Sequence, residues 1–221
     1  MPNTLFSRIA LGLLFASAAT LGAACKTAGG GSSTGTRILQ PGAPGQDTRT
    51  ISTAQATDLS KVQAVEADVK FMQGMIGHHA QAVEMVALIN DRTANPAMKL
   101  LGLRIQASQV DEIGMMQTWL KDRGKEVPGP HHHHTAEGFM PGMLTQAEMD
   151  ELAAAKGVEF DRLFLRGMIK HHGGAIKMVE DLFATPGAGQ EGAIFAFASD
   201  VDSDQRMEID RMGMMLKEIS K

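Results

Sequence analysis

Two segments of the chain carry the same pair of adjacent histidines within the same methionine spacing. Residues 71–86 read FMQGMIGHHAQAVEMV, and residues 164–179 read FLRGMIKHHGGAIKMV. On a helix the His and Met side chains of each block fall within one broad stripe, because residues three, four and seven apart share a face. Imidazole nitrogen and thioether sulfur suit copper, Cu(I) especially, and suit Ca²⁺ or Mg²⁺ poorly. The pattern therefore predicts that these residues bind metal: Met75, His78, His79, Met85, Met168, His171, His172 and Met178.

Each of these residue types also has a purely structural use. A single Met is a common gap-filler in helical cores, and a single buried His is often hydrogen-bonded without binding a ligand. Two adjacent imidazoles among apolar neighbours are costly to bury without partners, and this arrangement occurs twice, which favours metal binding. Nearby carboxyl and amide groups could orient the imidazoles or simply solvate helix faces. They are Asp68, Glu84, Asp161, Glu180, and the pairs Gln109/Glu112 and Gln205/Glu208.

A second, less favoured candidate for metal binding lies between the two blocks. Four consecutive His stand beside Gly and Pro, and such a run binds Cu²⁺, Ni²⁺ or Zn²⁺ with little geometric demand. The run could equally be a solvated loop, and its position inside the chain argues against a purification tag. This set comprises His131, His132, His133, His134, Met140 and Met143.

Four amphipathic helices are predicted to position these side chains. Apolar residues recur at threes, fours and sevens, and Pro- or Gly-containing breaks separate the segments. Thr145 and Glu148 have the spacing of a capping box that opens the third helix. Two similar αα-hairpins can bury their apolar stripes against each other, so we predict an all-α four-helix bundle with pseudo-twofold symmetry. The predicted helices cover residues 60–92, 98–123, 145–183 and 195–216.

The N-terminal segment predicts export. Arg8 precedes an apolar stretch of signal-peptide length that ends in small residues, directly before Cys25. The sequence LGAAC resembles a bacterial lipoprotein processing site, so lipidation of Cys25 is expected. The Gly-, Ser- and Pro-rich residues that follow have too little apolar content to build a core, which is typical of a flexible linker. We predict a signal peptide over 1–24, a linker over 25–55 and a duplicated metal-binding domain over 56–221.

Composition narrows the class of protein further. The net charge is −4, and no long basic run interleaved with aromatics occurs, so nucleic acid is not an expected partner. The chain has 16 Met but a single Cys, at the predicted processing site. Outside the cytoplasm thiolates are lost to oxidation or to disulfides, whereas a thioether supplies soft sulfur without losing a proton. The membrane is expected as a partner only through the lipid anchor.

The motifs resemble a bacterial domain-of-unknown-function family that includes the CopM-type copper-binding proteins. The resemblance spans roughly residues 58–217. It rests on the duplicated Asp-x-x-Phe-x-x-x-Met-x-x-His-His-x-x-Ala-x-x-Met pattern, on the Gln-x-x-Glu-Ile-x-x-Met sequence after each block, and on MPGMLTQAEMDEL between them. It implies a ferritin-like bundle, usually exported, that binds copper through Met and His and supports copper resistance. It also adds Met116 and Met212 to the expected metal-binding residues.

We therefore expect an exported protein that sequesters or hands over copper in the cell envelope or periplasm, Cu(I) in preference to Cu(II). A copper exporter or a metallochaperone would be its protein partner. One alternative is a ferritin-like metal-dependent oxidase, although the Glu-x-x-His motif of di-iron sites does not occur in the chain. The other alternative is a structural bundle whose His and Met only pack. An enzymatic role is the less favoured reading.

Overall fold

A computed structural model describes residues 37–40, 47–58, 61–129, 134–135 and 138–219. The predicted signal peptide and Cys25 lie outside these residues. The chain divides into two units, Met1–Ala56 and Thr57–Lys221. In the first unit, β1 (Ile38–Gln40) pairs antiparallel with β2 (Arg49–Ile51), and α1 (Thr53–Ala56) follows. These short elements lie within the segment predicted as a linker.

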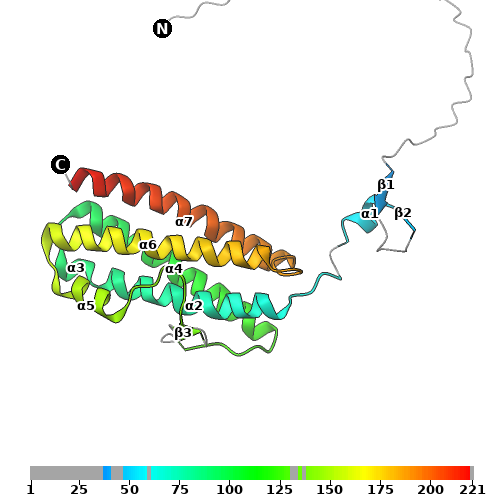
Figure 1. The fold of residues 1–221 in the computed structure, drawn as a ribbon, viewed down its shortest axis with the longest axis horizontal. Coiled ribbons are helices and arrows are strands. Elements are labelled where there is room, and N and C mark those ends of the chain that lie inside the picture. The colour runs from blue at the N-terminus through cyan, green and yellow to red at the C-terminus, as the bar shows by residue number, and fades with distance from the viewer. Residues whose placement is uncertain (1–36, 41–46, 59–60, 130–133, 136–137, 220–221) are drawn as a thin grey trace, which may run out of the picture. The chain divides into compact units, whose positions relative to one another are not determined.

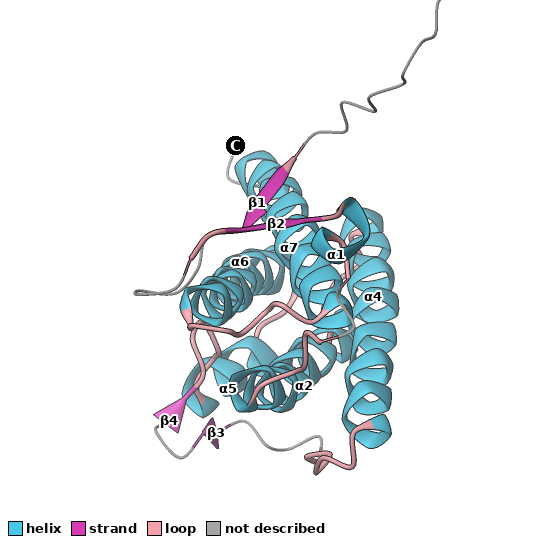
Figure 2. Ribbon diagram, turned by 90° about the vertical axis from the view of Figure 1, so that its right-hand side faces the viewer, coloured by secondary structure: helices cyan, strands magenta, loops and turns pink. Residues whose placement is uncertain are grey.

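The second unit is a bundle of four long helices. They are α2 (Glu66–Ala87), α4 (Pro96–Asp122), α6 (Gly157–Ala184) and α7 (Gly192–Ile219). Helix α2 packs along α4, α6 packs along α7, and the two hairpins meet through α2 and α6 (Figure 1). The view along the bundle in Figure 2 shows the four helices surrounding a common interior. The predicted ferritin-like four-helix bundle of two αα-hairpins is confirmed.

Short elements connect the long helices. Between α2 and α4 lies α3 (Ile89–Arg92), and the crossover between the hairpins holds β3 (His134–Thr135), β4 (Gly138–Phe139) and α5 (Gln146–Ala154). The two strands pair antiparallel, with His134 opposite Phe139. Among the helices that the structure describes, none is both long and apolar enough to cross a membrane.

Local signals explain where the helices begin and end. Asn95 caps α4 by accepting from the Ala97 N–H, and the Thr145 side chain accepts from the Glu148 N–H, as the capping box predicted. The prediction of one helix over 145–183 was wrong, because the chain is extended at Ala155 and Gly157 has a φ of +59°. Only glycine adopts that conformation readily, so α5 and α6 are separate helices.

Two apolar clusters fill the bundle, and each draws on all four long helices. The first includes Met75 of α2, Met116 of α4, Val179 of α6 and Phe197 of α7. The second includes Met85 of α2, Leu101 of α4, Phe164 of α6 and Met212 of α7. On every helix a stretch of buried polar residues separates the two clusters. That polar layer comprises His78, His79, Gln109, Glu112, His171, His172 and Gln205, with Glu208 at its edge.

The crossover docks tightly onto α2 and α6. The Gln81 side chain donates to the Leu144 carbonyl at 2.9 Å and accepts from the Leu144 N–H at 2.8 Å, so it holds the crossover backbone from both sides. On the other helix, a Cβ at Gly174 would lie 1.9 Å from the Pro141 carbonyl oxygen. The approach of Pro141 to α6 is therefore possible only because residue 174 has no side chain.

Adjacent glycines of α6 provide a matched test of this docking. Gly174→Ala should lower the free energy of unfolding by about 1–3 kcal/mol, because backbone atoms of the crossover would have to move away. Gly173→Ala should be neutral or stabilising by up to about 1 kcal/mol, since a Cβ at Gly173 meets nothing within 4 Å and alanine favours a helix. Urea unfolding of the two variants measures the difference, and equal stability would show that the crossover is not held in this way.

Candidate metal centre

Four imidazoles lie at one level of the bundle interior. His78, His79 and His172 have 0% of their surface exposed, and His171 has 1%. They come from the middle of α2 and the middle of α6, which run through both apolar clusters. The rings of His78 and His171 are in contact, with centroids 3.8 Å apart and planes inclined by 41°. The structure thus brings together the two His pairs that the sequence places 93 residues apart.

The crossover sets the orientation of His78. Its Nε2 lies 3.0 Å from the Pro141 carbonyl oxygen. A carbonyl oxygen can only accept, so Nε2 carries the proton, and Nδ1 of the neutral ring keeps its lone pair. Nδ1 is buried and has no hydrogen-bond partner among the described residues. His78 therefore presents an unprotonated nitrogen to the bundle interior.

Carboxylates orient two of the other imidazoles in the same way. His79 Nε2 lies 2.5 Å from Glu112 Oε2, and His172 Nε2 lies 2.6 Å from Glu208 Oε2. Burial alone would raise the pKa of Glu112, but the hydrogen bond from His79, the charge of that residue and the hydrogen bond from Ser108 together outweigh it and lower that pKa. An ionised Glu112 accepts the Nε2 proton of His79, so Nδ1 is the ring nitrogen that has no carboxylate partner.

Buried nitrogens without partners are the main feature of the layer. Nδ1 of His79 and of His172 have no hydrogen-bond partner within the described part of the chain. Neither ring nitrogen of His171 makes a well-formed hydrogen bond there, although the His78 backbone lies near enough to oppose the lowering of its pKa. Metal-bound His residues typically donate their second nitrogen to a carboxylate or a backbone carbonyl, as three of these rings do. His78, His79 and His172 could therefore bind a cation through Nδ1.

Burial also keeps the central pair of imidazoles uncharged. It is the main cause that lowers the pKa of His78 from 6.5 to about 3; the nearby His79 lowers it further, and the hydrogen bond to Pro141 opposes the shift. Burial likewise lowers the pKa of His171 well below its usual value, with a further contribution from His78. At neutral pH both rings are neutral, which is the form that binds metal.

Thioethers border the imidazole layer on both sides. Met75 and Met116 belong to the first apolar cluster, and Met168 and Met212 belong to the second, all with 0% exposure. The remaining predicted methionines are Met85, which is fully buried, and Met178, which is partly buried near the first cluster. In the crossover, Met140 and Met143 are buried as well.

The donor types present fit a soft metal ion. In the ranges that the structure describes, no three His, Cys, Asp or Glu side chains converge so that they could hold a metal ion by themselves. A site in this layer would therefore combine imidazole nitrogen with thioether sulfur, which suits Cu(I) and other soft ions better than hard cations. The fit rests on the unpartnered nitrogens and on Met75 and Met168, which stand one helical turn before the two His pairs.

Several other residues that the sequence suggested for the site do not contribute a described contact to the imidazole layer. Asp68 closes the first turn of α2 by accepting from the Val65 N–H and also accepts from the Gly189 N–H, while Asp161 accepts from the Asn95 side chain. Glu84 and Glu180 are exposed. Of the suggested orienting residues, Glu112 and Glu208 hydrogen-bond to an imidazole. His131, His132 and His133 lie outside the described residues, and only the backbone of His134 is described, in β3.

Two orienting contacts have no signal in the sequence. His78 contacts the backbone carbonyl of Pro141, and a backbone contact cannot be predicted from the type of residue. The only nearby feature in the sequence is the MPGM segment between the hairpins. The clamp of Gln81 on Leu144 joins residues 63 apart, and a single Gln within a helical block is not distinctive.

Fold and polar layer together define a duplicated four-helix bundle with a His/Met interior. The model of the domain of unknown function DUF305 matches residues 68–216, and the chain belongs to this family. A DUF305 protein from Streptomyces coelicolor, described as secreted, is 29% identical, with a TM-score of 0.61 over 70% of this chain and 94% of that one.

Similar structures have been solved with metal. CopM in its Cu(I)-bound form is 28% identical, with a TM-score of 0.54 over 68% of this chain and 96% of CopM. CopM in its Cu(II)-bound form is 29% identical, with a TM-score of 0.57 over the same shares. A curated relative, uncharacterised protein L153 of Acanthamoeba polyphaga mimivirus, is 38% identical over 63 residues, which are 28% of this chain and 41% of the relative. The match thus spans less than half of that relative.

The buried imidazoles predict how the stability of the metal-free protein depends on pH. Below about pH 6.5 the unfolded chain takes up protons on His78 and His171 that the folded chain does not, since their folded pKa values are lowered. Stability should therefore be full above pH 6.5 and should fall below it, by about 1.4 kcal/mol per pH unit for each group.

Urea unfolding between pH 7.5 and 5.5, with a chelator present, measures this loss. His171→Phe breaks no well-formed hydrogen bond of the described residues and should reduce the loss by about half, because one of the two titrating groups is gone. A wild-type protein equally stable at both pH values would contradict the neutral, buried state of the pair.

Proposed function

We propose that this protein binds copper, preferentially Cu(I), in its imidazole layer and sequesters it or hands it over in the cell envelope, supporting metal homeostasis or resistance. The observation that carries the proposal is the set of buried ring nitrogens of His78, His79, His171 and His172 that lack partners. Leaving such groups unpaired in a core costs free energy, and a bound cation would remove that cost. The copper-bound forms of CopM support the choice of metal.

The candidate ligands follow from the layer and its borders. The imidazoles would bind through Nδ1 where Pro141, Glu112 and Glu208 hold Nε2, and the thioethers on either side would complete the set. Sulfur that does not titrate and neutral imidazole both suit an ion that must later be released to a copper exporter or a metallochaperone. The proposed ligands are Met75, His78, His79, Met85, Met116, Met168, His171, His172, Met178 and Met212.

Cu(I) titration of the metal-free protein against a chromogenic chelator tests the proposal. His171→Phe should keep the helicity measured by circular dichroism, because the two apolar clusters remain, while Cu(I) affinity should fall by about tenfold or more. Met75→Leu with Met168→Leu conserves volume and should weaken binding of Cu(I) more than binding of Cu²⁺.

Exposed methionines supply the control for these variants. Met115 and Met207 lie on the bundle surface with 55% and 61% exposure, so Met115→Leu with Met207→Leu should bind Cu(I) like the wild type. Wild-type affinity in both the His171 and the Met75/Met168 variants would mean that the layer only packs, as in the structural alternative.

Export and lipid anchoring complete the proposal. Arg8, the apolar segment and Cys25 support them, and the similarity to a secreted Streptomyces protein supports export. We expect the mature protein in the membrane fraction with a lipid mass on Cys25, and Cys25→Ala should abolish that mass. Cell fractionation with mass spectrometry measures both. An intact Met1 N-terminus in the cytoplasmic fraction would contradict export.

A further inference from the structure

Helix α4 is apolar on two opposite faces. Its inward face carries buried residues of both apolar clusters, among them Leu101, Ile105 and Met116. On the outward face, residues without charge recur at alternating spacings of three and four, and all of them are exposed. This set, called the α4 seam below, comprises Leu100, Leu103, Ala107, Val110 and Gly114.

The spacing of the seam is that of a helix that packs against a second helix. A surface helix normally turns charged and polar side chains away from the core, whereas apolar residues at threes and fours form the contact between paired helices. The large side chains of the seam are between 49% and 64% exposed. In Figure 2, α4 forms one side of the bundle, and no other described helix of the bundle lies on its outer side.

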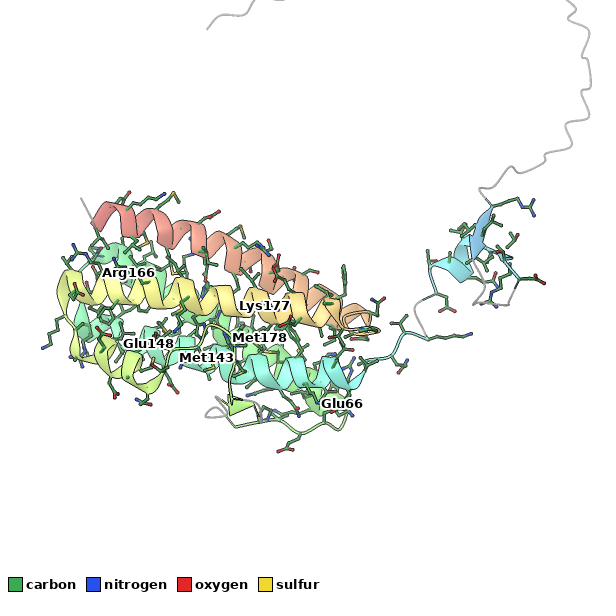
Figure 3. All side chains as sticks on the ribbon, in the orientation of Figure 1. Glu66, Met143, Glu148, Arg166, Lys177 and Met178 are labelled. Carbon is green, nitrogen blue, oxygen red and sulfur yellow. The ribbon has the colours of Figure 1, made fainter. Side chains whose placement is uncertain are left out.

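The internal repeat shows that the bundle does not require an apolar outer face. When Gln109 of α4 is aligned with Gln205 of α7, the positions equivalent to the seam are small, polar or charged. They are Ala196, Ser199, Ser203, Arg206 and Asp210. Figure 3 shows nitrogen and oxygen atoms along the upper edge of α7. The two hairpins share one fold, so the apolar outer face of α4 needs a reason that is specific to α4.

The seam is complementary in size to a second copy of itself that runs antiparallel. With Leu103 placed opposite Gly114 of the second copy, Ala107 lies opposite Val110, and the twofold axis repeats both pairs. Each layer then joins a larger side chain to a smaller one, which lets two helices approach closely and fill their contact. A Cβ at Gly114 would meet nothing within 4 Å among the described residues, so packing within the chain does not require glycine there.

Charges beside the seam favour the same register. Arg104 lines a cavity that α4 shares with α7, and Asp111 follows two helical turns later on the same side of α4. Both residues are exposed. In the antiparallel pair, Arg104 of each copy lies near Asp111 of the other, so the contact gains two ion pairs of opposite sign. The charges therefore match a second copy of this chain.

We propose that the α4 seam is a dimer interface, in which α4 packs antiparallel on α4 of a second copy. From Leu100 to Gly114 the seam spans about 21 Å, so the interface is small and the dimer is weak, with a Kd of about 10 µM. The seam lies on the face of α4 opposite the imidazole layer. Each subunit thus keeps its own layer, and the dimer forms with or without a bound ion.

Sedimentation velocity of the metal-free, full-length protein tests the interface, with Cys25→Ala in every sample to remove the lipid. Between about 1 and 100 µM the protein should pass from monomer to dimer. Leu103→Lys with Val110→Lys should raise the Kd about tenfold or more, because lysines of both copies would be buried together. The matched control, Val158→Lys with Phe195→Lys, places the same charges at exposed apolar positions of α6 and α7 and should dimerise like the wild type.

Two further changes distinguish a specific pair from apolar adhesion. Gly114→Leu enlarges the apolar surface and removes a glycine from a helix, so the monomer should resist urea better. The Kd of the dimer should nevertheless rise about tenfold, because Leu103 of the second copy no longer fits. Arg104→Asp should raise the Kd about threefold by placing like charges together, and Arg104→Asp with Asp111→Arg should restore it.

Circular dichroism confirms that each variant is folded. A protein that stays monomeric over the whole concentration range would overturn the interface, and so would a dimer that Leu103→Lys with Val110→Lys leaves intact. Tighter association of Gly114→Leu would show adhesion through apolar area alone and would refute the paired seam. An exchange of the two charges that fails to restore the Kd would overturn the antiparallel register.

Discussion

Burying an imidazole costs free energy unless its polar nitrogens find partners, and this bundle buries four at one level. Much of the surrounding structure meets that constraint. Glu112 of α4 and Glu208 of α7 accept hydrogen bonds from His79 and His172. The Pro141 carbonyl of the crossover accepts one from His78, so three of the four rings have one nitrogen hydrogen-bonded. The apolar clusters above and below exclude water from the layer. What remains are nitrogens turned inward without partners, which a stable packing core would not need.

The crossover contacts the two repeats differently, so one pair of equivalent histidines differs in its hydrogen bonds. The contacts of His79 with Glu112 and of His172 with Glu208 are equivalent in the two hairpins. His78 donates to the Pro141 carbonyl of the crossover, whereas its equivalent, His171, has no such contact with the crossover and makes no well-formed hydrogen bond among the described residues. The two central imidazoles thus have unequal surroundings, and the side of the bundle that the crossover covers differs from its counterpart.

The sequence predicts the parts of this structure that depend on local periodicity. The four helices, the capping box at Thr145 and the alignment of the two His pairs follow from spacing, because a helix repeats every 3.6 residues. The separation of α5 from α6 was missed, since the left-handed conformation of Gly157 is not visible in a periodic pattern. The roles of Pro141 and Gly174 depend on the approach of two backbones from distant parts of the chain, and no residue type encodes such an approach uniquely.

Each apolar cluster takes side chains from all four long helices, which bears on how such a chain could arise. A single hairpin of this kind would expose its half of both clusters and two unshielded imidazoles, so it could persist only by pairing with a copy of itself. Both halves of such a dimer would carry the same residues. In a single chain the two hairpins can differ, and a connecting segment is present that two separate hairpins would lack. That segment orients one His of the central pair and not the other, an asymmetry that two identical hairpins related by a twofold axis would not show.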